Sequence, residues 1–190
     1  MEWSSFLSAL LGGALALAGQ GVQASFSRSS ELRHRGEAAA VAIRDLSQQI
    51  EALYPKATGR CGRLESRLEP TRDLAVAKLR GEALLIPQAP VRQRVSEVGS
   101  MLGDLFAIEQ FGGVTERRAV WELSRWLETV VGSYLRRERQ AGEPDFLPEY
   151  RTAISDAYAA WDEQYEMQRE YERAQRESGD DSQRAGETEA

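Results

Sequence analysis

The stretch TERRAVWELSRWLETVVGSYLRRER, residues 115–139, sets the fold class of this chain. Its apolar side chains recur three and four residues apart, which is the spacing of one face of an α-helix. They are Val120, Leu123, Leu127, Val130 or Val131, and Tyr134, with Trp121 and Trp126 beside them. Thr115 is a suitable N-cap, and Arg136, Arg137 and Arg139 suit the negative end of the helix dipole. The stretch predicts an amphipathic helix with one buried face.

The segments on either side repeat this pattern. After a loop over residues 142–148, Pro148 begins a second helix whose predicted face consists of Tyr150, Ile154, Ala157, Tyr158, Trp161 and Tyr165. Before residue 115, apolar residues again recur three and four positions apart; they are Val91, Val95, Val98, Leu102 and Leu105. They predict a single helix of about twenty residues that ends at Gly112 and Gly113.

Two further segments complete the predicted body. Residues 30–54 form an amphipathic pattern that Pro55 closes, with a face made of Leu32, Ala39, Ile43, Leu46, Ile50 and Leu53. Pro70 suits the first turn of a helix through Leu85, although the alternation of Leu74, Val76 and Lys78 also permits a short strand.

These patterns define the expected domain organisation. Four or five amphipathic helices joined by short loops predict an all-α fold, an antiparallel helical bundle over residues 28–176. Residues 177–190 are polar and contain no core residue, so we expect a disordered acidic tail there.

Residues 3–27, WSSFLSALLGGALALAGQGVQASFS, contain no charged side chain. A helix over residues 3–26 would be about 36 Å long, enough to cross a hydrocarbon core of about 30 Å. We therefore expect residues 1–27 to be an N-terminal transmembrane helix. Two alternatives stay open: a signal peptide cleaved near Ala16-Leu17-Ala18, although no Lys or Arg precedes the apolar part, and a buried or interfacial helix of a soluble protein.

The flanking charges predict the orientation of this anchor. Arg28, Arg33 and Arg35 follow it, whereas nothing basic except the α-amine precedes it. Because positively charged flanks stay inside, we expect a single-pass protein of the cell membrane with its N-terminus outside and its body in the cytoplasm. The same three arginines are candidate contacts to lipid headgroups.

Two surfaces are candidates for partner binding. In the anchor, small residues follow one helical face with a polar residue at its end, as in membrane helices that pair closely: Ser8, Gly12, Gly13, Ala16 and Gln20. In the body, the candidate partner face is aromatic and comprises Tyr150, Tyr158, Trp161 and Tyr165. The alternative for these aromatic residues is that they fill the core of the bundle.

The sequence contains no recognisable catalytic, metal-binding or nucleotide-binding motif. His34 is the only histidine and Cys61 the only cysteine, so neither a zinc site of His and Cys ligands nor a site with several histidines is possible within one chain. No phosphate-binding or dinucleotide motif occurs. The net charge of −6 argues against a nucleic-acid partner. We expect no enzyme activity, no cofactor and no metal.

Two short motifs carry a resemblance. The run Leu10 to Gly19 before an arginine-rich segment, and Leu84-Leu85-Ile86-Pro87 leading into Val91-Arg92, resemble small single-pass bacterial membrane proteins with an N-terminal Gly-Gly anchor and a cytoplasmic helical region. The resemblance covers about a quarter of the chain and implies no catalytic residue. The expected function is that of a membrane-anchored interaction or scaffold protein; the alternative is a small self-associating sensor or effector of the bilayer.

Overall fold

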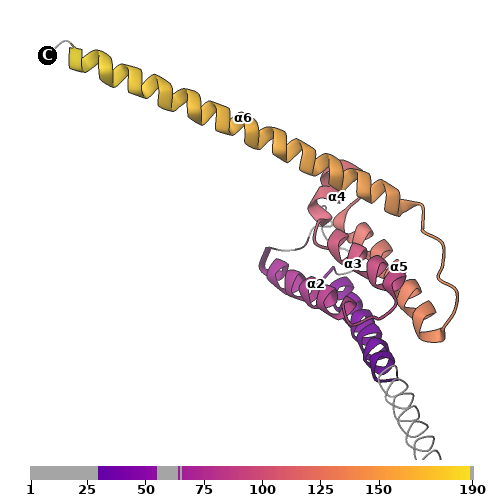
Figure 1. Ribbon diagram of the computed structural model, residues 1–190. Helices are drawn as coiled ribbons and strands as arrows, with labels where there is room; N and C mark the ends of the chain where they lie inside the picture. Colours follow the sequence, from indigo (N-terminus) through magenta and orange to yellow (C-terminus); the bar gives the residue numbers. More distant parts are fainter. Residues whose placement is uncertain (1–29, 55–63, 65, 189–190) are drawn as a thin grey trace, which may run out of the picture.

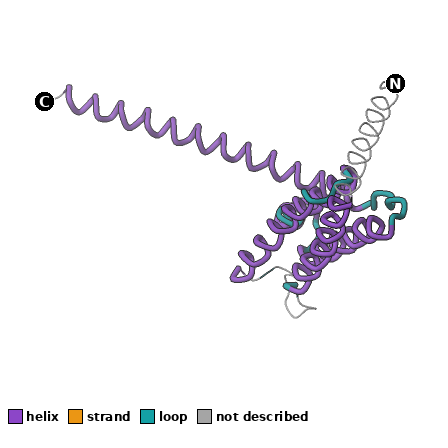
Figure 2. Tube along the Cα trace, turned by 60° about the horizontal axis from the view of Figure 1, so that its bottom comes forward, coloured by secondary structure: helices purple, strands orange, loops and turns teal. Residues whose placement is uncertain are grey.

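The computed structural model describes residues 30–54, 64 and 66–188. Its helices are the one over residues 30–52, η1 (Ser66–Leu68), α2 (Glu69–Ala83), α3 (Ala89–Met101), α4 (Leu105–Gly112), α5 (Glu116–Arg136) and α6 (Phe146–Thr188). In Figure 2 the described part of the chain consists of helices and loops and contains no strand. The predicted all-α fold is therefore confirmed, and the alternative of a strand within residues 70–85 is wrong.

Helix α5 forms one wall of the hydrophobic core. It packs against α3 and α4, and every residue of its predicted face is buried: Val120, Leu123, Leu127, Val130, Val131 and Tyr134. Trp126 is also buried, whereas Trp121 stays exposed. The Thr115 hydroxyl accepts a hydrogen bond of 3.4 Å from the amide of Arg118, which confirms the predicted N-cap.

The helix over residues 30–52 runs antiparallel to α5. Residue numbers increase along the first helix while those of its contacts in α5 decrease. Gly36 lies against Tyr134, the Gln48 side chain donates a hydrogen bond to Glu128, and the Tyr54 hydroxyl donates one to Glu116. Ile43 and Ile50 are fully buried, as predicted. Leu32 is half-exposed, so its assignment to the buried face was wrong; the periodicity continues beyond the point where other helices cover it.

The single helix predicted between Pro90 and Gly112 is two helices. Helix α3 ends at Met101 and α4 begins at Leu105, after a turn in which the Gly103 amide bonds to the Ser100 carbonyl. Glycine weakens a helix interior and aspartate favours a helix start, so Gly103 and Asp104 break the helix although the apolar spacing continues across them. The predicted end of the segment is confirmed, because Gly113 adopts a φ of 65° after α4.

Helix α6 packs on α4 through its first turns and then leaves the body (Figure 1). Its buried residues are Leu147, Tyr150, Ala153 and Ala157. After Trp161 every side chain that the structure describes is exposed. The helix continues to Thr188, which differs from the predicted disorder over residues 177–190, because the absence of core residues removes tertiary packing but not the backbone hydrogen bonds of a helix.

The predicted membrane anchor is not part of the described structure. Within the described residues, no helix is both long enough and apolar enough to cross a bilayer. Residues 1–27 lie outside that part, together with their candidate packing face and Arg28; the face consists of Ser8, Gly12, Gly13, Ala16 and Gln20.

Candidate functional site

Aromatic side chains from α4 and α6 meet where α6 leaves the body. The Trp161 ring stacks on Phe106 at a centroid distance of 6.4 Å and an interplanar angle of 14°. Tyr158 meets Trp161 edge-on at 5.3 Å, and its hydroxyl donates a 3.1 Å hydrogen bond to Asp104 Oδ1. Phe106 and Tyr158 remain about half-exposed. This aromatic cluster, Phe106, Tyr158 and Trp161, fixes the direction of α6 and leaves part of its rings accessible.

Tyr165 continues the same helical face beyond the body. It follows Tyr158 and Trp161 at spacings of seven and four residues, so the three side chains share one side of α6. The Tyr165 side chain is 63% exposed, and the Arg169 guanidinium lies 5.7 Å from its ring centroid. The face that packs on α4 therefore extends outward with a large aromatic side chain that no other described helix covers.

Tyr150 does not belong to an accessible face. It is 1% exposed, its ring packs against Phe146 at 5.3 Å, and its hydroxyl donates a hydrogen bond to Glu122. Burial raises the pKa of Tyr150, and the Glu122 carboxylate raises it further. The assignment of Tyr150 to the partner face is therefore corrected: it is a core residue at the junction of α5 and α6.

The projecting part of α6 is acidic. Residues 162–177 contain six aspartates and glutamates against three arginines. This projecting part, called the α6 arm below, combines Tyr165 with a net negative charge. Such a surface suits a partner that offers a basic helix or groove.

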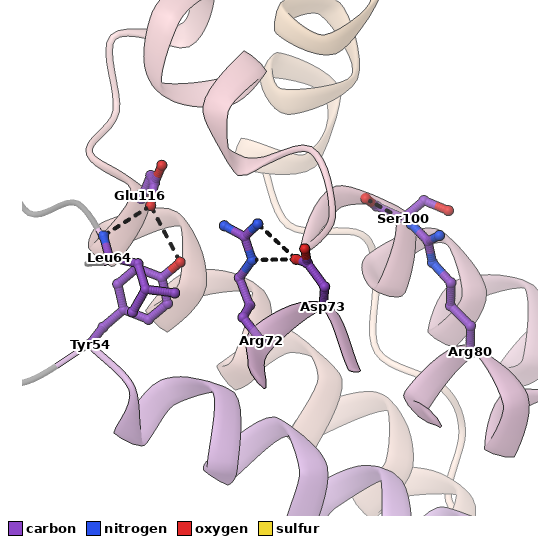
Figure 3. Close-up of polar contacts among 7 residues, drawn as sticks. All are labelled: Tyr54, Leu64, Arg72, Asp73, Arg80, Ser100 and Glu116. Carbon is purple, nitrogen blue, oxygen red and sulfur yellow. Dashed lines mark hydrogen bonds and ion pairs between the residues drawn. The ribbon is translucent and has the colours of Figure 1, made fainter. Parts of the chain in front are cut away.

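At the start of α5, the buried carboxylate of Glu116 forms hydrogen bonds that link three segments of the chain (Figure 3). Glu116 is 6% exposed; its Oε2 accepts from the Tyr54 hydroxyl at 3.3 Å and from the Leu64 amide at 3.4 Å. Burial raises the pKa of Tyr54 to about 12, although Arg72, which also bonds Asp73 at 2.8 Å, opposes that shift. The arrangement satisfies buried polar atoms and holds the end of the first helix to α5.

Beside this group lies an open cleft of about 910 Å³. Among its lining residues are Tyr54, Arg117, Arg118, Trp121 and Arg125. Arg118 bonds Glu122 at 2.9 Å, and Arg125 lies over the Trp121 ring at 5.7 Å, so two of the cations already have partners. The cleft has the charge and the aromatic surface to accept an anionic group.

The two described arginines among the predicted headgroup contacts lie on exposed turns of the first helix. Arg33 pairs with Glu37 at 3.2 Å, and Arg35 pairs with Glu31. Exposed pairs at this spacing contribute only a few tenths of a kcal/mol, so they leave both guanidinium groups able to exchange partners.

Three features of these sites were not predicted from sequence. Phe106 was missed because the predicted face of this segment contained its neighbour Leu105, and the contact of Phe106 with Trp161 joins residues that lie far apart in the sequence. Glu116 follows an N-cap, where an acidic residue is ordinary, so nothing in the sequence marks it as buried. Its contact with Tyr54 joins residues 62 positions apart.

Comparison with known proteins adds no assignment. No family model, no curated protein and no solved structure matches the chain. Among the described residues, no group of three or more His, Cys, Asp or Glu side chains is placed to hold a metal ion.

Proposed function

We propose that this chain is a membrane-anchored interaction protein whose α6 arm presents the docking surface for another protein. Residues 1–27 would hold it in the cell membrane and place the body, residues 28–176, in the cytoplasm. The observation that carries the docking role is the continuation of the packed face of α6 past the body, with Tyr165 exposed on it.

Helix α6 is much longer than the helices packed inside the body. The helix has 43 residues, and α5, which is enclosed by the body, has 21. A helix that packing does not cover gains little stability from tertiary contacts, so a long exposed arm needs another reason to be retained. Exposed tyrosines supply contact area at low conformational cost, and interface anchors are enriched in them.

The charge of the arm defines the partner more closely. Because the arm is acidic, it would steer a basic partner surface toward itself and repel acidic ones. The aromatic cluster gives the arm a fixed direction relative to the body. Anchoring would raise the local concentration of this surface for partners that are also at the membrane.

Site-specific photo-crosslinking in cells tests the docking role. A photoreactive phenylalanine analogue replaces Tyr165 in one full-length chain and Glu163, on the opposite side of the same exposed turn, in another. We expect a discrete crosslinked protein from position 165 that is absent from position 163. Equal crosslinking from both positions, or none from either, would contradict a face-specific docking surface.

A further inference from the structure

The cleft beside the start of α5 is lined by a stripe of two arginines and a tryptophan. Arg117, Trp121 and Arg125 follow one another at intervals of four residues, so they share one side of α5. The Arg125 guanidinium lies over the Trp121 ring, and Trp121 is 49% exposed. Within the described residues, neither Arg117 nor Arg125 forms an ion pair. The stripe therefore offers two cations and one aromatic ring to an occupant of the cleft.

A second helix contributes a carboxylate to the same cleft. Glu51 and Gln48 belong to the helix over residues 30–52, and both line the cleft. Three arginines and one glutamate are among the described residues that line it, so the cleft is basic. Its volume of about 910 Å³ suits the side chains of one helix face, which is a common way in which a groove recognises a peptide. The fitting occupant is an acidic helix that carries an aromatic side chain and a cation for Glu51.

One face of the α6 arm has this complementary set of side chains. Its members recur at spacings of three, four and three residues and are all exposed; they are Asp162, Tyr165, Arg169 and Glu172. The arm face thus presents two carboxylates, one aromatic ring and one cation. The cleft presents two arginines, one aromatic ring and one carboxylate in return.

The spacing of the charges agrees as well. Arg117 and Arg125 are eight residues apart, or about 12 Å along α5. Asp162 and Glu172 are ten residues apart, or about 15 Å along α6. In each set the aromatic residue lies between the two charged ones. Two helices that lie side by side can therefore bring opposite charges together at both ends and aromatic rings together between them.

The arm of the same chain points away from this cleft. Helix α6 runs antiparallel to α4, because a Cβ atom added to Gly112 would be 3.3 Å from Ala153 Cβ, whereas Trp161 stacks on Phe106. The arm therefore leaves the body at the start of α4 and leads away from it (Figure 1). The cleft lies at the start of α5, just after the end of α4. The arm that can enter it is that of a second copy.

We propose that the α6 arm of one copy of this chain binds in the cleft of another copy, with its two carboxylates against the arginine stripe and Tyr165 against Trp121. The inference rests on the docking role proposed above for the arm and names its partner. Because every chain carries one arm and one cleft, the contact is heterologous: it closes between two copies or joins several in sequence. Membrane anchoring would raise the local concentration of both surfaces.

Charge reversal in the full-length chain tests this contact. The chain is purified in mild detergent, and light scattering over a concentration series gives the dissociation constant of its self-association. The cleft variant is Arg117→Glu with Arg125→Glu, and the arm variant is Asp162→Arg with Glu172→Arg. The two variants are measured separately and as an equimolar mixture.

We expect each variant alone to associate at least about tenfold more weakly than the wild type, because like charges then meet in the cleft. The mixture should recover association, since the unchanged arm of the cleft variant meets the unchanged cleft of the arm variant. Recovery also shows that both variants fold. The matched control is Glu163→Arg with Glu170→Arg, which makes the same change in charge on the side of the arm opposite Tyr165 and should associate like the wild type.

Several outcomes would overturn the inference. A cleft variant that associates normally while the arm variant does not would show that arms pair with each other. Association that neither reversal weakens would assign it to another surface, and a mixture that does not recover would contradict the match of charges. A wild-type chain that stays monomeric would refute the second copy as partner, whereas a crosslink from position 165 to a different protein would leave the docking role of the arm intact.

Discussion

Helices α5 and α6 both begin with apolar side chains at spacings of three and four, yet their surroundings differ. Helix α5 is buried along its whole face, from Ala119 to Tyr134. Helix α6 is buried only from Leu147 to Ala157, and beyond Trp161 its described side chains are exposed. Periodicity therefore identifies which side chains share a face, whereas the neighbouring helices decide whether that face is covered.

The largest expected effect distinguishes the covered helix from the uncovered arm. Leu127→Ala removes a fully buried side chain of α5 and should lower the free energy of unfolding by about 2–5 kcal/mol. Tyr165→Ala in the arm should change it by less than about 0.5 kcal/mol. Denaturant unfolding of the full chain in detergent measures both. A large loss from Tyr165→Ala would show that the arm is part of the folded core.

A smaller effect tests how closely the first helix approaches α5. Gly36→Ala places a methyl group against Pro87 and the Tyr134 hydroxyl, which should cost about 1–3 kcal/mol in unfolding free energy. Gly81→Ala in α2 is the matched control, because nothing lies within 4 Å of its Cβ position, and it should stabilise the chain by about 0.5–1 kcal/mol. If both changes stabilise, the close contact is absent.

The polar contact at the start of α5 should make a similar or lesser contribution. Glu116→Ala leaves the Tyr54 hydroxyl and the Leu64 amide without their acceptor, which should cost about 1–3 kcal/mol. Glu128→Ala in the same helix removes only the acceptor of a 3.4 Å hydrogen bond from the Gln48 side chain and should cost less than about 0.5 kcal/mol. A double-mutant cycle with Tyr54→Phe measures the coupling, and additive effects would show that the two side chains do not interact in solution.

The last expected effect is confined to alkaline solution and is the pH dependence associated with Tyr54. Its pKa is about 12 in the folded chain, above the ordinary value of 10.0, so the folded state keeps the phenol proton in that interval and the unfolded state loses it. The Tyr54 contribution to stability is complete below pH 10 and declines as the pH rises toward 12. The difference between wild type and Tyr54→Phe in unfolding experiments isolates it. A difference that does not change with pH would contradict the buried position of this hydroxyl.

The extent to which the structure could be predicted from the sequence differs from helix to helix. For α5, the cap at Thr115 and the apolar periodicity were sufficient, because the local signals and the packing agree. For the segment before it, the apolar spacing continues across Gly103 and Asp104, and it concealed the break between α3 and α4. For α6, the sequence identified the aromatic face but could not tell Tyr150 in the core from Tyr165 in solvent. That depends on where α4 begins, because Trp161 packs on Phe106 in the first turn of α4 and the described side chains of α6 beyond Trp161 are exposed.

Residues that act through long-range contacts were not predictable. The Glu116 carboxylate acquires its hydrogen-bond partners, Tyr54 and Leu64, from a part of the chain 52 to 62 positions away. In the Leu84-Leu85-Ile86-Pro87 motif, the burial of Ile86 and the contact of Pro87 with Gly36 of the first helix likewise depend on tertiary packing.

The most direct test of the account is the cellular location of the body. A fluorescent protein that matures only in the cytoplasm is fused after Ala190, and living cells are imaged. The account predicts a bright cell rim, because the anchor holds the chain in the membrane with its body inside. Diffuse fluorescence would contradict the anchor, and dark cells that contain intact fusion protein would contradict the cytoplasmic orientation.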